Sequence, residues 1–260
     1  MRDYQRIRYE LDDHVATVTI ARADVRNALD NLANIELGQA FDDFAADPDA
    51  WVAIITGEGD KAFCAGNDLK ARARGDVLTQ DKWSGGFGGL ARRHDLFKPV
   101  ICAANGSALG GGFEIVLACD IVVAADHARF ALPEARIGQL ADAGGAHRLP
   151  RALPWQRAMG MLLTGRDIDA ATARDWGLVN EVVPGEDLMP AARRWAAELA
   201  GLSPLALRAA KEAASLGLHM PLEEAIGTSF PGRDLLRASD DFLEGPRAFA
   251  EKRQPRWTGR

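Results

Sequence analysis

Three short apolar runs in the first half of the chain limit most strongly what it can fold into. They are VAIIT at residues 52–56, PVICAA at 99–104 and IVVAA at 121–125. The runs are nearly continuous rather than alternating, which is typical of strands buried on both faces of a sheet. A further strand is expected at 14–20, and helical segments at 31–46 and 111–119 separate the strands. Strands that alternate with helices predict an α/β fold with a parallel sheet and helices packed outside it.

The second half of the chain has a different pattern. After Pro150 the segments are mainly helical, with proline and glycine at their breaks. The predicted helical segments are 155–163, 185–202, 203–216 and 222–249. We therefore expect an α/β core at residues 1–185 and a helical C-terminal region at 186–260.

The composition fits a globular protein and argues against polyanionic partners. Of 260 residues, 47% are hydrophobic, and 37 acidic against 31 basic side chains leave a net charge of −6. A protein that wraps nucleic acid usually has a basic face, and no apolar run reaches the roughly 18 to 20 residues of a membrane span. The three cysteines (Cys64, Cys102 and Cys119) lie outside any CxxC or His/Cys cluster, which argues against a zinc site or a disulfide framework. These features predict a cytoplasmic protein with no metal, no nucleic-acid partner and no membrane association.

Two glycine-rich loops follow two of the predicted strands directly. KAFCAGNDLK, residues 61–70, comes after the first run, and NGSALGGGFE, residues 105–114, comes after the second and opens a helix. A strand that leads into small residues and a helix start presents free backbone N–H groups, which bind an anion or a developing oxyanion. Neither loop is a GxGxxG dinucleotide fingerprint or a P-loop. Taken alone, each more commonly allows a helix to pack closely on a sheet.

Two glutamates accompany the loops. Glu114 ends the second loop among apolar neighbours, and Glu134 follows Pro133 in ALPEAR. The apolar neighbours of Glu114 argue against a wholly solvated position. For both residues, an acid in a first helical turn that complements the helix dipole remains an alternative to catalysis.

These segments occur together in an order that resembles a known family. KAFCAGNDLK, NGSALGGGFEIVLACD, and ARFALPEARIG followed by AGGAHRLP are accompanied by ADVRNALD, LLTGRDIDAATARDWGLVNEVV and FAEKRQPRWTG. In combination they resemble the enoyl-CoA hydratase (crotonase) family over residues 7–259. The resemblance implies a crotonase-type spiral of ββα units with a helical C-terminal trimerisation region, assembled as a homotrimer or a dimer of trimers. It also implies an acyl-CoA substrate in fatty-acid β-oxidation, with coenzyme A as part of the substrate and no permanently bound cofactor.

The family's functional residues have matching positions in this sequence. The resemblance implies that the N–H groups of Asn67 and Gly111 hold the enolate oxygen and that the catalytic residues are Glu114 and Glu134. It implies CoA and thioester contacts at Ala65, Asn67, Asp68, Leu69 and Lys70. Hydration of a conjugated thioester agrees with these roles, because charge builds on the thioester oxygen, where each donor is worth about 3 to 4 kcal/mol. Two carboxyl groups that share a proton would supply an acceptor and a donor to one water.

A basic segment ends the chain. Residues 246–260 contain five bases (Arg247, Lys252, Arg253, Arg256 and Arg260) and one acid, Glu251, for a local charge of +4. CoA carries phosphates, and in the resembled family a basic C-terminal helix approaches the nucleotide, often from a neighbouring subunit. Lys252 and Arg26 are therefore candidates for phosphate contacts, and a solvated charged tail remains the alternative.

The sequence departs from the family pattern near the later glycine pair. Many members have Pro-Gly before it, and the N–H of that glycine helps to hold the water; here Ala141 and Asp142 take those places. Any residue keeps the N–H, but Asp142 would bring a third carboxylate, which would alter the water geometry or indicate a polar acyl group. Trp83 and Phe87 are expected to line the acyl pocket. The acyl chain itself cannot be identified from these residues.

We interpret the chain as an enoyl-CoA hydratase, a hydro-lyase that adds water to a 2-enoyl-CoA. The enzymatic alternatives are a carnitinyl-CoA-type dehydratase and a 3-enoyl to 2-enoyl-CoA isomerase. Isomerases of the family commonly work with one glutamate, so the presence of both Glu114 and Glu134 favours hydration. A catalytically silent acyl-CoA-binding scaffold is the alternative from a different functional class.

Overall fold

A six-stranded sheet forms the centre of the molecule. The computed structural model describes residues 2–76 and 83–260. The strand order is β1 (Ile7–Asp12), β2 (Val15–Ile20), β3 (Val52–Gly57), β5 (Val100–Ala104), β7 (Ile121–Ala125) and β10 (Glu181–Val183). Only β1 runs antiparallel to its neighbour, and the other adjacent pairs are parallel. The three strands expected from the apolar runs, and the further strand expected at 14–20, are confirmed within a residue or two at their ends.

The apolar runs are continuous because the sheet is covered on both faces. Ile55 of β3 packs in a core cluster that contains Phe41 of helix α1 (Asn31–Ala46). Its neighbour Ile54 packs in a second cluster that contains Ala192 of helix α7 (Leu188–Ala200). Successive side chains of a strand point to opposite faces, so each residue of such a strand meets an apolar layer.

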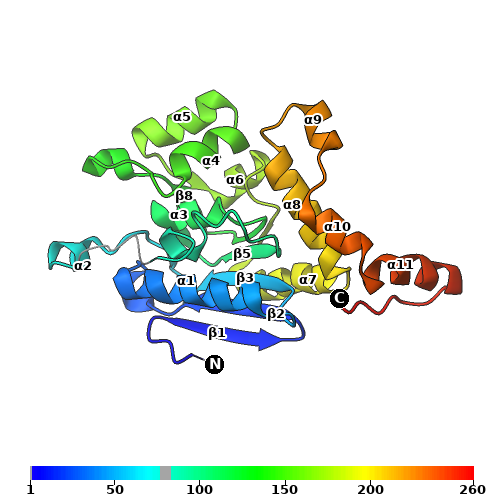
Figure 1. Cartoon of the computed structure of the whole chain (residues 1–260). Coiled ribbons are helices and arrows are strands. Elements are labelled where there is room, and N and C mark those ends of the chain that lie inside the picture. The colour runs from blue at the N-terminus through cyan, green and yellow to red at the C-terminus, as the bar shows by residue number, and fades with distance from the viewer. Residues whose placement is uncertain (1, 77–82) are drawn as a thin grey trace.

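A second, smaller sheet was not expected from the sequence. It contains β4 (Ala62–Cys64), β6 (Ser107–Leu109), β8 (Arg129–Ala131) and β9 (Ile168–Asp169). Each of β3, β5 and β7 in the large sheet is followed by a short strand of the small sheet, and then by a helical turn. This repeated strand–strand–helix unit is the ββα spiral that the resemblance implied (Figure 1).

Helices and 3₁₀ turns make up the rest of the described secondary structure. The remaining helical elements are 3₁₀ turns η1 (Ala23–Val25), η3 (Phe87–Gly89), η4 (Glu134–Ile137) and η5 (Gly185–Asp187), and helices α2 (Leu69–Ala73), α3 (Gly111–Val116), α4 (Gly145–Ala152), α5 (Trp155–Thr164), α6 (Ala170–Asp175), α8 (Pro204–Gly217), α9 (Leu222–Gly227), α10 (Pro231–Arg237) and α11 (Asp240–Glu251). The helix expected at 111–119 ends earlier, at Val116, because the N–H groups of Ala118 and Cys119 bond to carbonyl groups only three residues back.

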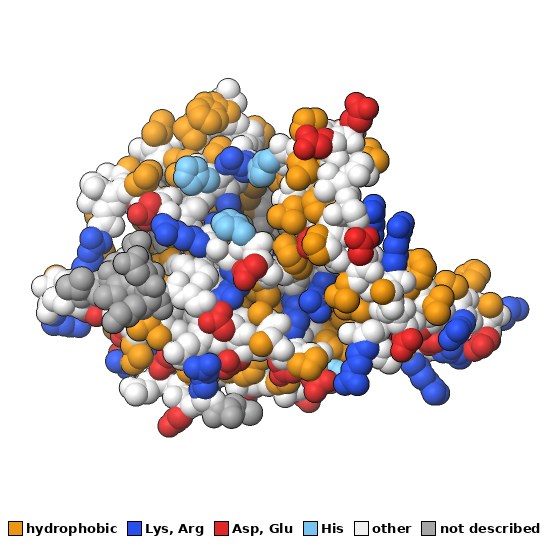
Figure 2. All heavy atoms as spheres, in the orientation of Figure 1, with side chains coloured by type: hydrophobic (Ala, Val, Ile, Leu, Met, Phe, Trp, Pro, Cys, Tyr) orange, Lys and Arg blue, Asp and Glu red, His pale blue; other side chains and the backbone are white. Residues whose placement is uncertain are grey.

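The C-terminal helices leave apolar side chains exposed. In Figure 1, α11 extends from the body on the side away from α2. Leu222 of α9 is 76% exposed and Phe249 of α11 is 87% exposed, and orange side chains are visible over this part of the molecule in Figure 2. No helix in the described ranges is both long and apolar enough to cross a membrane.

Candidate active site

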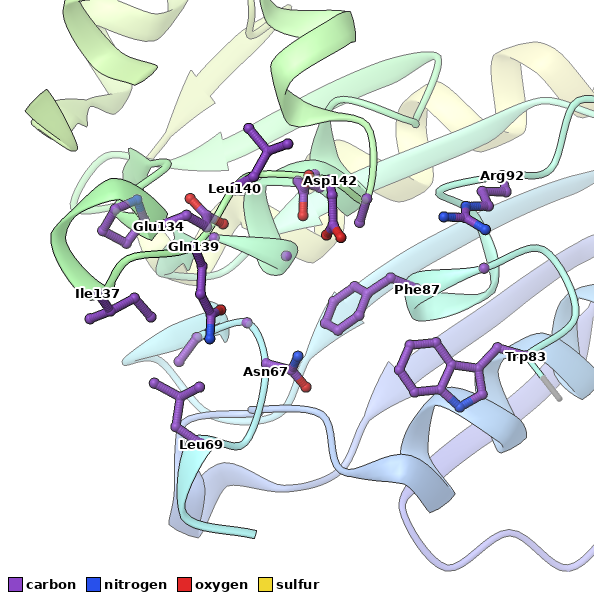
Figure 3. Close-up of a pocket in the computed structure, with 18 of the residues that line it drawn as sticks. Asn67, Leu69, Trp83, Phe87, Arg92, Glu134, Ile137, Gln139, Leu140 and Asp142 are labelled. Carbon is purple, nitrogen blue, oxygen red and sulfur yellow. The ribbon is translucent and has the colours of Figure 1, made fainter. Parts of the chain in front are cut away.

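The two glycine-rich loops meet at one cavity of about 280 Å³ (Figure 3). Its walls come from the loop after β4, the loop that opens α3, the segment around η3, the turn at η4 and the loop at 139–143. The predicted residues that line it are Ala65, Asn67, Leu69, Trp83, Phe87, Gly111, Glu114, Glu134 and Asp142. Residues that are far apart in the sequence thus line one cavity.

The two loops lie backbone against backbone, which only glycine permits. A Cβ atom at Gly66 would lie 2.7 Å from the Leu109 carbonyl oxygen and 3.2 Å from the Gly111 nitrogen. A Cβ atom at Gly112 would overlap the Cys64 carbonyl oxygen. Gly66 also has a φ of +87°, in the left-handed region that favours glycine. The glycines therefore bring the N–H groups that follow them to the same cavity.

The N–H groups of Asn67 and Gly111 donate to no acceptor among the residues that the structure describes. Asn67 forms a parallel bridge with Leu29, but the hydrogen bonds of that bridge use the Leu29 and Asp68 N–H groups, at 2.8 and 3.0 Å. Gly111 is the first residue of α3, where an N–H has no partner within the helix. Two free donors at one cavity can hold a developing negative oxygen.

Glu114 is buried at the cavity wall. Its side chain is 3% exposed on α3, and its Oε1 accepts a hydrogen bond from the Gly145 N–H at 2.7 Å. Burial raises the pKa of Glu114 to about 7, and the charges of Glu134 and Asp142 act in the same direction. Such a carboxyl group exchanges a proton near neutral pH, as a general acid or base requires.

The carboxyl group of Glu134 lies so close to Gly110 that a side chain at that position would not fit. It is the first residue of η4, and a Cβ atom at Gly110 would lie only 2.8 Å from its Oε1. Its Oε2 is buried and has no partner within the described ranges. Burial raises the pKa of Glu134 above its ordinary value, and the charge of Asp142 adds to this effect. An unpartnered carboxyl oxygen at a cavity is available to a ligand or a water.

Asp142 supplies the third carboxylate that the sequence indicated. Its side chain is exposed and lines the cavity, on the same side as Glu134 in Figure 3. The Asp142 N–H, however, donates to the Leu140 carbonyl oxygen at 2.8 Å. Asp142 thus keeps an N–H, but this N–H is already bonded within the loop, because the loop turns back on itself at Leu140.

Trp83 and Phe87 form an aromatic wall, as expected from the sequence. Their rings meet edge to face with centroids 6.2 Å apart. The Trp83 indole N–H donates to Asn31 Oδ1 at 2.8 Å, and the Phe87 ring occupies the space that a Gly111 side chain would need. The wall is fixed at one end by a hydrogen bond and at the other by the backbone of α3.

Four predicted CoA-contact residues do not line the cavity. Asp68 is buried as the N-cap of α2, where it accepts from Ala71 N–H at 2.9 Å and lies 3.2 Å from the Arg22 guanidinium. Lys70 is exposed on α2, and Arg26 is exposed after η1. Lys252 is exposed at the end of α11, on the side of the molecule away from α2 (Figure 1). Their roles stay predictions.

The structure also adds residues that the sequence did not single out. Arg92, Ile137, Gln139 and Leu140 line the cavity, and Gly145 supplies the N–H to Glu114. Gly145 belongs to a glycine pair that opens a helix, a pattern that indicates free N–H donors. Nothing in the sequence near Arg92 or Ile137 distinguishes them from ordinary loop residues.

Comparisons with known proteins agree on one family. A family model described as enoyl-CoA hydratase/isomerase matches residues 10–260. The carnitinyl-CoA dehydratase of Citrobacter koseri is 48% identical over 238 residues, covering 90% of this chain and 91% of the relative. That of Salmonella enteritidis is also 48% identical, over 240 residues, with the same coverage of 90% and 91%.

Solved structures agree with this similarity. A probable enoyl-CoA hydratase/isomerase from Mycobacterium abscessus has a TM-score of 0.89 at 38% identity, covering 98% of this chain and 99% of that one. A carnitinyl-CoA hydratase from Mycobacterium avium has a TM-score of 0.78 at 41% identity, covering 99% and 100%. The crotonase-type fold expected from the sequence is confirmed.

Proposed function

The chain belongs to the enoyl-CoA hydratase/isomerase family, and on that premise we propose that it adds water reversibly to the double bond of a 2-enoyl-CoA thioester. It is then a hydro-lyase. The observation that carries the proposal is the position of Glu114 and Glu134 on one cavity beside the free N–H groups of Asn67 and Gly111.

The proposed reaction divides the work among these groups. Glu114 orients the water and takes its proton as the oxygen bonds to C3 of the enoyl group. The electron pair of the double bond moves toward the thioester, whose oxygen becomes negative and is held by the Asn67 and Gly111 N–H groups. Glu134 then delivers a proton to C2, which completes the addition, and the reverse sequence removes water.

The raised carboxyl pKa values support acid–base catalysis at this site. Burial raises the pKa of Glu114 to about 7, and burial also raises that of Glu134; two neighbouring carboxyl groups of this kind titrate as a pair. One ionised and one protonated carboxyl group provide the base and the acid that a water addition needs. An isomerase needs only one such group, because it moves a proton between two carbons.

Carnitinyl-CoA-type dehydration is a second candidate, which Asp142 favours. The curated relatives carry that name, and a carnitinyl group ends in a quaternary ammonium. Aromatic faces and a carboxylate attract such a cation, and Trp83, Phe87 and Asp142 all line the cavity. At a pH above the titration of Glu114, Asp142→Asn should lower kcat/KM for crotonobetainyl-CoA while leaving kcat/KM for crotonyl-CoA nearly unchanged. Equal changes for the two substrates would exclude a role of Asp142 in recognising a cation.

We also propose how CoA and neighbouring subunits complete the site. The segment Ala65, Asn67, Asp68, Leu69 and Lys70 contacts CoA, and Arg26 and Lys252 contact its phosphates. Lys252 lies at the end of α11, on the side of the molecule away from α2, and our proposal is that it reaches the site of a neighbouring subunit. The exposed apolar side chains of α9 and α11 support residues 186–260 as the oligomerisation region of a homotrimer or a dimer of trimers. The core at 1–185 carries the acyl-CoA site, and we place the enzyme in the cytoplasm.

A panel of CoA thioesters tests the proposed function. Purified protein is incubated with 2-enoyl, 3-enoyl and crotonobetainyl thioesters, and both the loss of conjugated enoyl absorbance and the products are recorded. Formation of 3-hydroxyacyl-CoA from 2-enoyl-CoA supports hydration. Conversion of 3-enoyl to 2-enoyl thioester without hydration would show an isomerase, and binding without any conversion would show a scaffold.

A further inference from the structure

Arg148 is a half-buried cation on α4 whose charge has no dedicated partner. Its guanidinium makes no ion pair and no side-chain hydrogen bond with any residue in the described ranges. It lines a separate cavity of about 200 Å³, together with Leu96, Phe97 and Val100, none of which lines the first cavity. A guanidinium that is partly withdrawn from water usually requires a compensating anion.

The acidic side chain that lines this second cavity already has a partner. Asp120, which also lines it, is held by Lys211 at 2.6 Å. The carboxylate whose charge acts on Arg148 is Glu114, together with the thiol group of Cys119. Burial lowers the pKa of Arg148, and Glu114 counters that effect. The anion that compensates Arg148 therefore belongs to the candidate active site.

Arg148 also contacts the turn that holds Glu114. Its Nη1 occupies the space that a Cβ atom would take at Gly144, whose φ is +116°. The Arg148 N–H donates to the Gly144 carbonyl oxygen at 2.7 Å. The next residue, Gly145, donates its own N–H to Glu114 Oε1 at 2.7 Å. A single side chain thus packs against the turn on one side and places its charge near the carboxylate that the turn holds.

We propose that Arg148 is a positioning residue, whose guanidinium holds the Gly144–Gly145 turn and stabilises the ionised form of Glu114 without touching the substrate. This inference rests on the proposed function for its catalytic meaning, because a base must be ionised before it can accept a proton from water. Its physical content, the coupling of Arg148 to Glu114, does not depend on which reaction the site performs.

Arg148 opposes the other charges that face Glu114. Glu134 on η4 and Asp142 on the adjoining loop both favour the protonated form of Glu114. Arg92 also lines the cavity, from the segment after η3. The charge of Glu114 raises the pKa of Arg148, and because an interaction between two charges is mutual, Arg148 on α4 favours the ionised form of Glu114. Its removal should leave Glu114 with the two acidic neighbours and the Gly145 N–H.

Infrared titration of Glu114 tests the inference directly. The protonated carboxyl band that disappears in Glu114→Gln identifies Glu114, and its pH midpoint is followed in each variant. In Arg148→Gln the midpoint should rise by on the order of one pH unit. Arg148→Lys should restore most of the shift because it keeps the charge. Arg151→Gln is the matched control, since Arg151 is exposed on the same helix and bonds only to the His147 carbonyl oxygen.

Activity measurements separate positioning from simple support of the fold. In Arg148→Gln, the acid limb of the kcat profile should move to higher pH, while KM for acyl-CoA changes little. An unchanged Glu114 midpoint in folded Arg148→Gln, or equal midpoints in the Gln and Lys variants, would overturn the inference. If Arg148→Gln does not fold, Arg148→Met keeps the apolar stem and serves the same test. Failure of every enoyl thioester to react would instead overturn the proposed function, because the titration needs no substrate.

Discussion

The Gly145 N–H and the Glu114 carboxylate are joined by a 2.7 Å hydrogen bond that crosses from the start of α4 to α3. The bond fixes one oxygen of a carboxyl group that is otherwise withdrawn from water. A Cβ atom at Gly145 would lie 3.0 Å from the same oxygen, so the close approach depends on glycine. This contact orients the group that we assign as the base and partly offsets the cost of ionising it.

The pH dependence of hydration should follow Glu114. Its pKa is raised to about 7, so kcat/KM for crotonyl-CoA should fall as the pH drops through this region and the base becomes protonated. Asp142→Asn removes a negative neighbour that raises this pKa, and it should move the acid limb to lower pH. Steady-state rates from pH 5 to 9 (a range of about four units around this pKa) provide the measurement. A profile that is flat across the acid side would contradict the assignment of Glu114 as the base.

Glu114→Gln should stabilise the folded protein at alkaline pH. The folded pKa of about 7 lies above the ordinary value of 4.5, so the unfolded state loses its proton first and stability declines as the pH rises between these values. The full shift corresponds to about 3 kcal/mol, and we expect a gain of about 1 to 3 kcal/mol at pH 8 that vanishes below pH 4.5. Urea unfolding at several pH values gives the comparison. A variant that is less stable than the parent at pH 8 would show that the buried Glu114 carboxylate does not destabilise the folded protein.

Gly111→Ala should reduce turnover by an order of magnitude or more. Its new Cβ atom would meet the Phe87 ring, so either the ring or the N–H donor must move. Gly160→Ala is the control, because Gly160 is a helical glycine with no atom within 4 Å of the Cβ position. If Gly111→Ala turns over crotonyl-CoA normally, the oxyanion donor lies elsewhere.

Lys252→Gln should raise KM for acyl-CoA with little change in kcat, because a remote contact acts equally on the ground and transition states. The effect should decline with added salt and with a pantetheine thioester, which lacks the nucleotide phosphates. Arg247→Gln, an exposed base of the same helix, controls for the general field of the segment. Equal effects of the two variants would remove Lys252 as a specific phosphate contact.

Subunit mixing tests where Lys252 acts. Lys252→Gln is exchanged with Glu134→Gln subunits, so that some sites combine an intact Glu134 with a neighbouring intact Lys252. If Lys252 serves a neighbouring subunit, part of the activity should return with a low KM. Persistence of only high-KM activity would place the effect of Lys252 within its own chain.

The core strands could be predicted from the sequence, but the small sheet could not. Ile54 and Ile55 face different apolar layers, and this two-sided burial appears in the sequence as a continuous apolar run. The strands of the small sheet, such as β9 at Ile168–Asp169, are too short to give a periodic pattern. They exist because the tertiary structure places them beside one another. The edge strand β1 was missed because most of its residues are exposed.

Only part of the candidate site could be predicted from local sequence patterns, for a similar reason. Glycine-rich loops after apolar strands indicate free N–H donors, so the two loops could be proposed from residues alone, whereas Gly111 itself came from the family resemblance. The pairing of Glu114 with Glu134 came from the family resemblance, because no local pattern joins positions that only the fold brings together. The bond of the Asp142 N–H to Leu140 could not be predicted, since it depends on how the loop turns. The sequence did not indicate a role for Arg148, because the proposed positioning role depends on contacts that only the tertiary structure creates.

The most direct test of the account is the turnover of crotonyl-CoA by the parent enzyme and by Glu134→Gln, with product-CoA affinity measured in parallel. The parent should convert the substrate to 3-hydroxybutyryl-CoA. Glu134→Gln should lose about a hundredfold or more in kcat, because the proton for C2 can no longer be supplied, while CoA binding persists. Glu114→Gln should lose hydration to a similar degree. Near-normal turnover by Glu134→Gln would contradict the two-carboxylate mechanism.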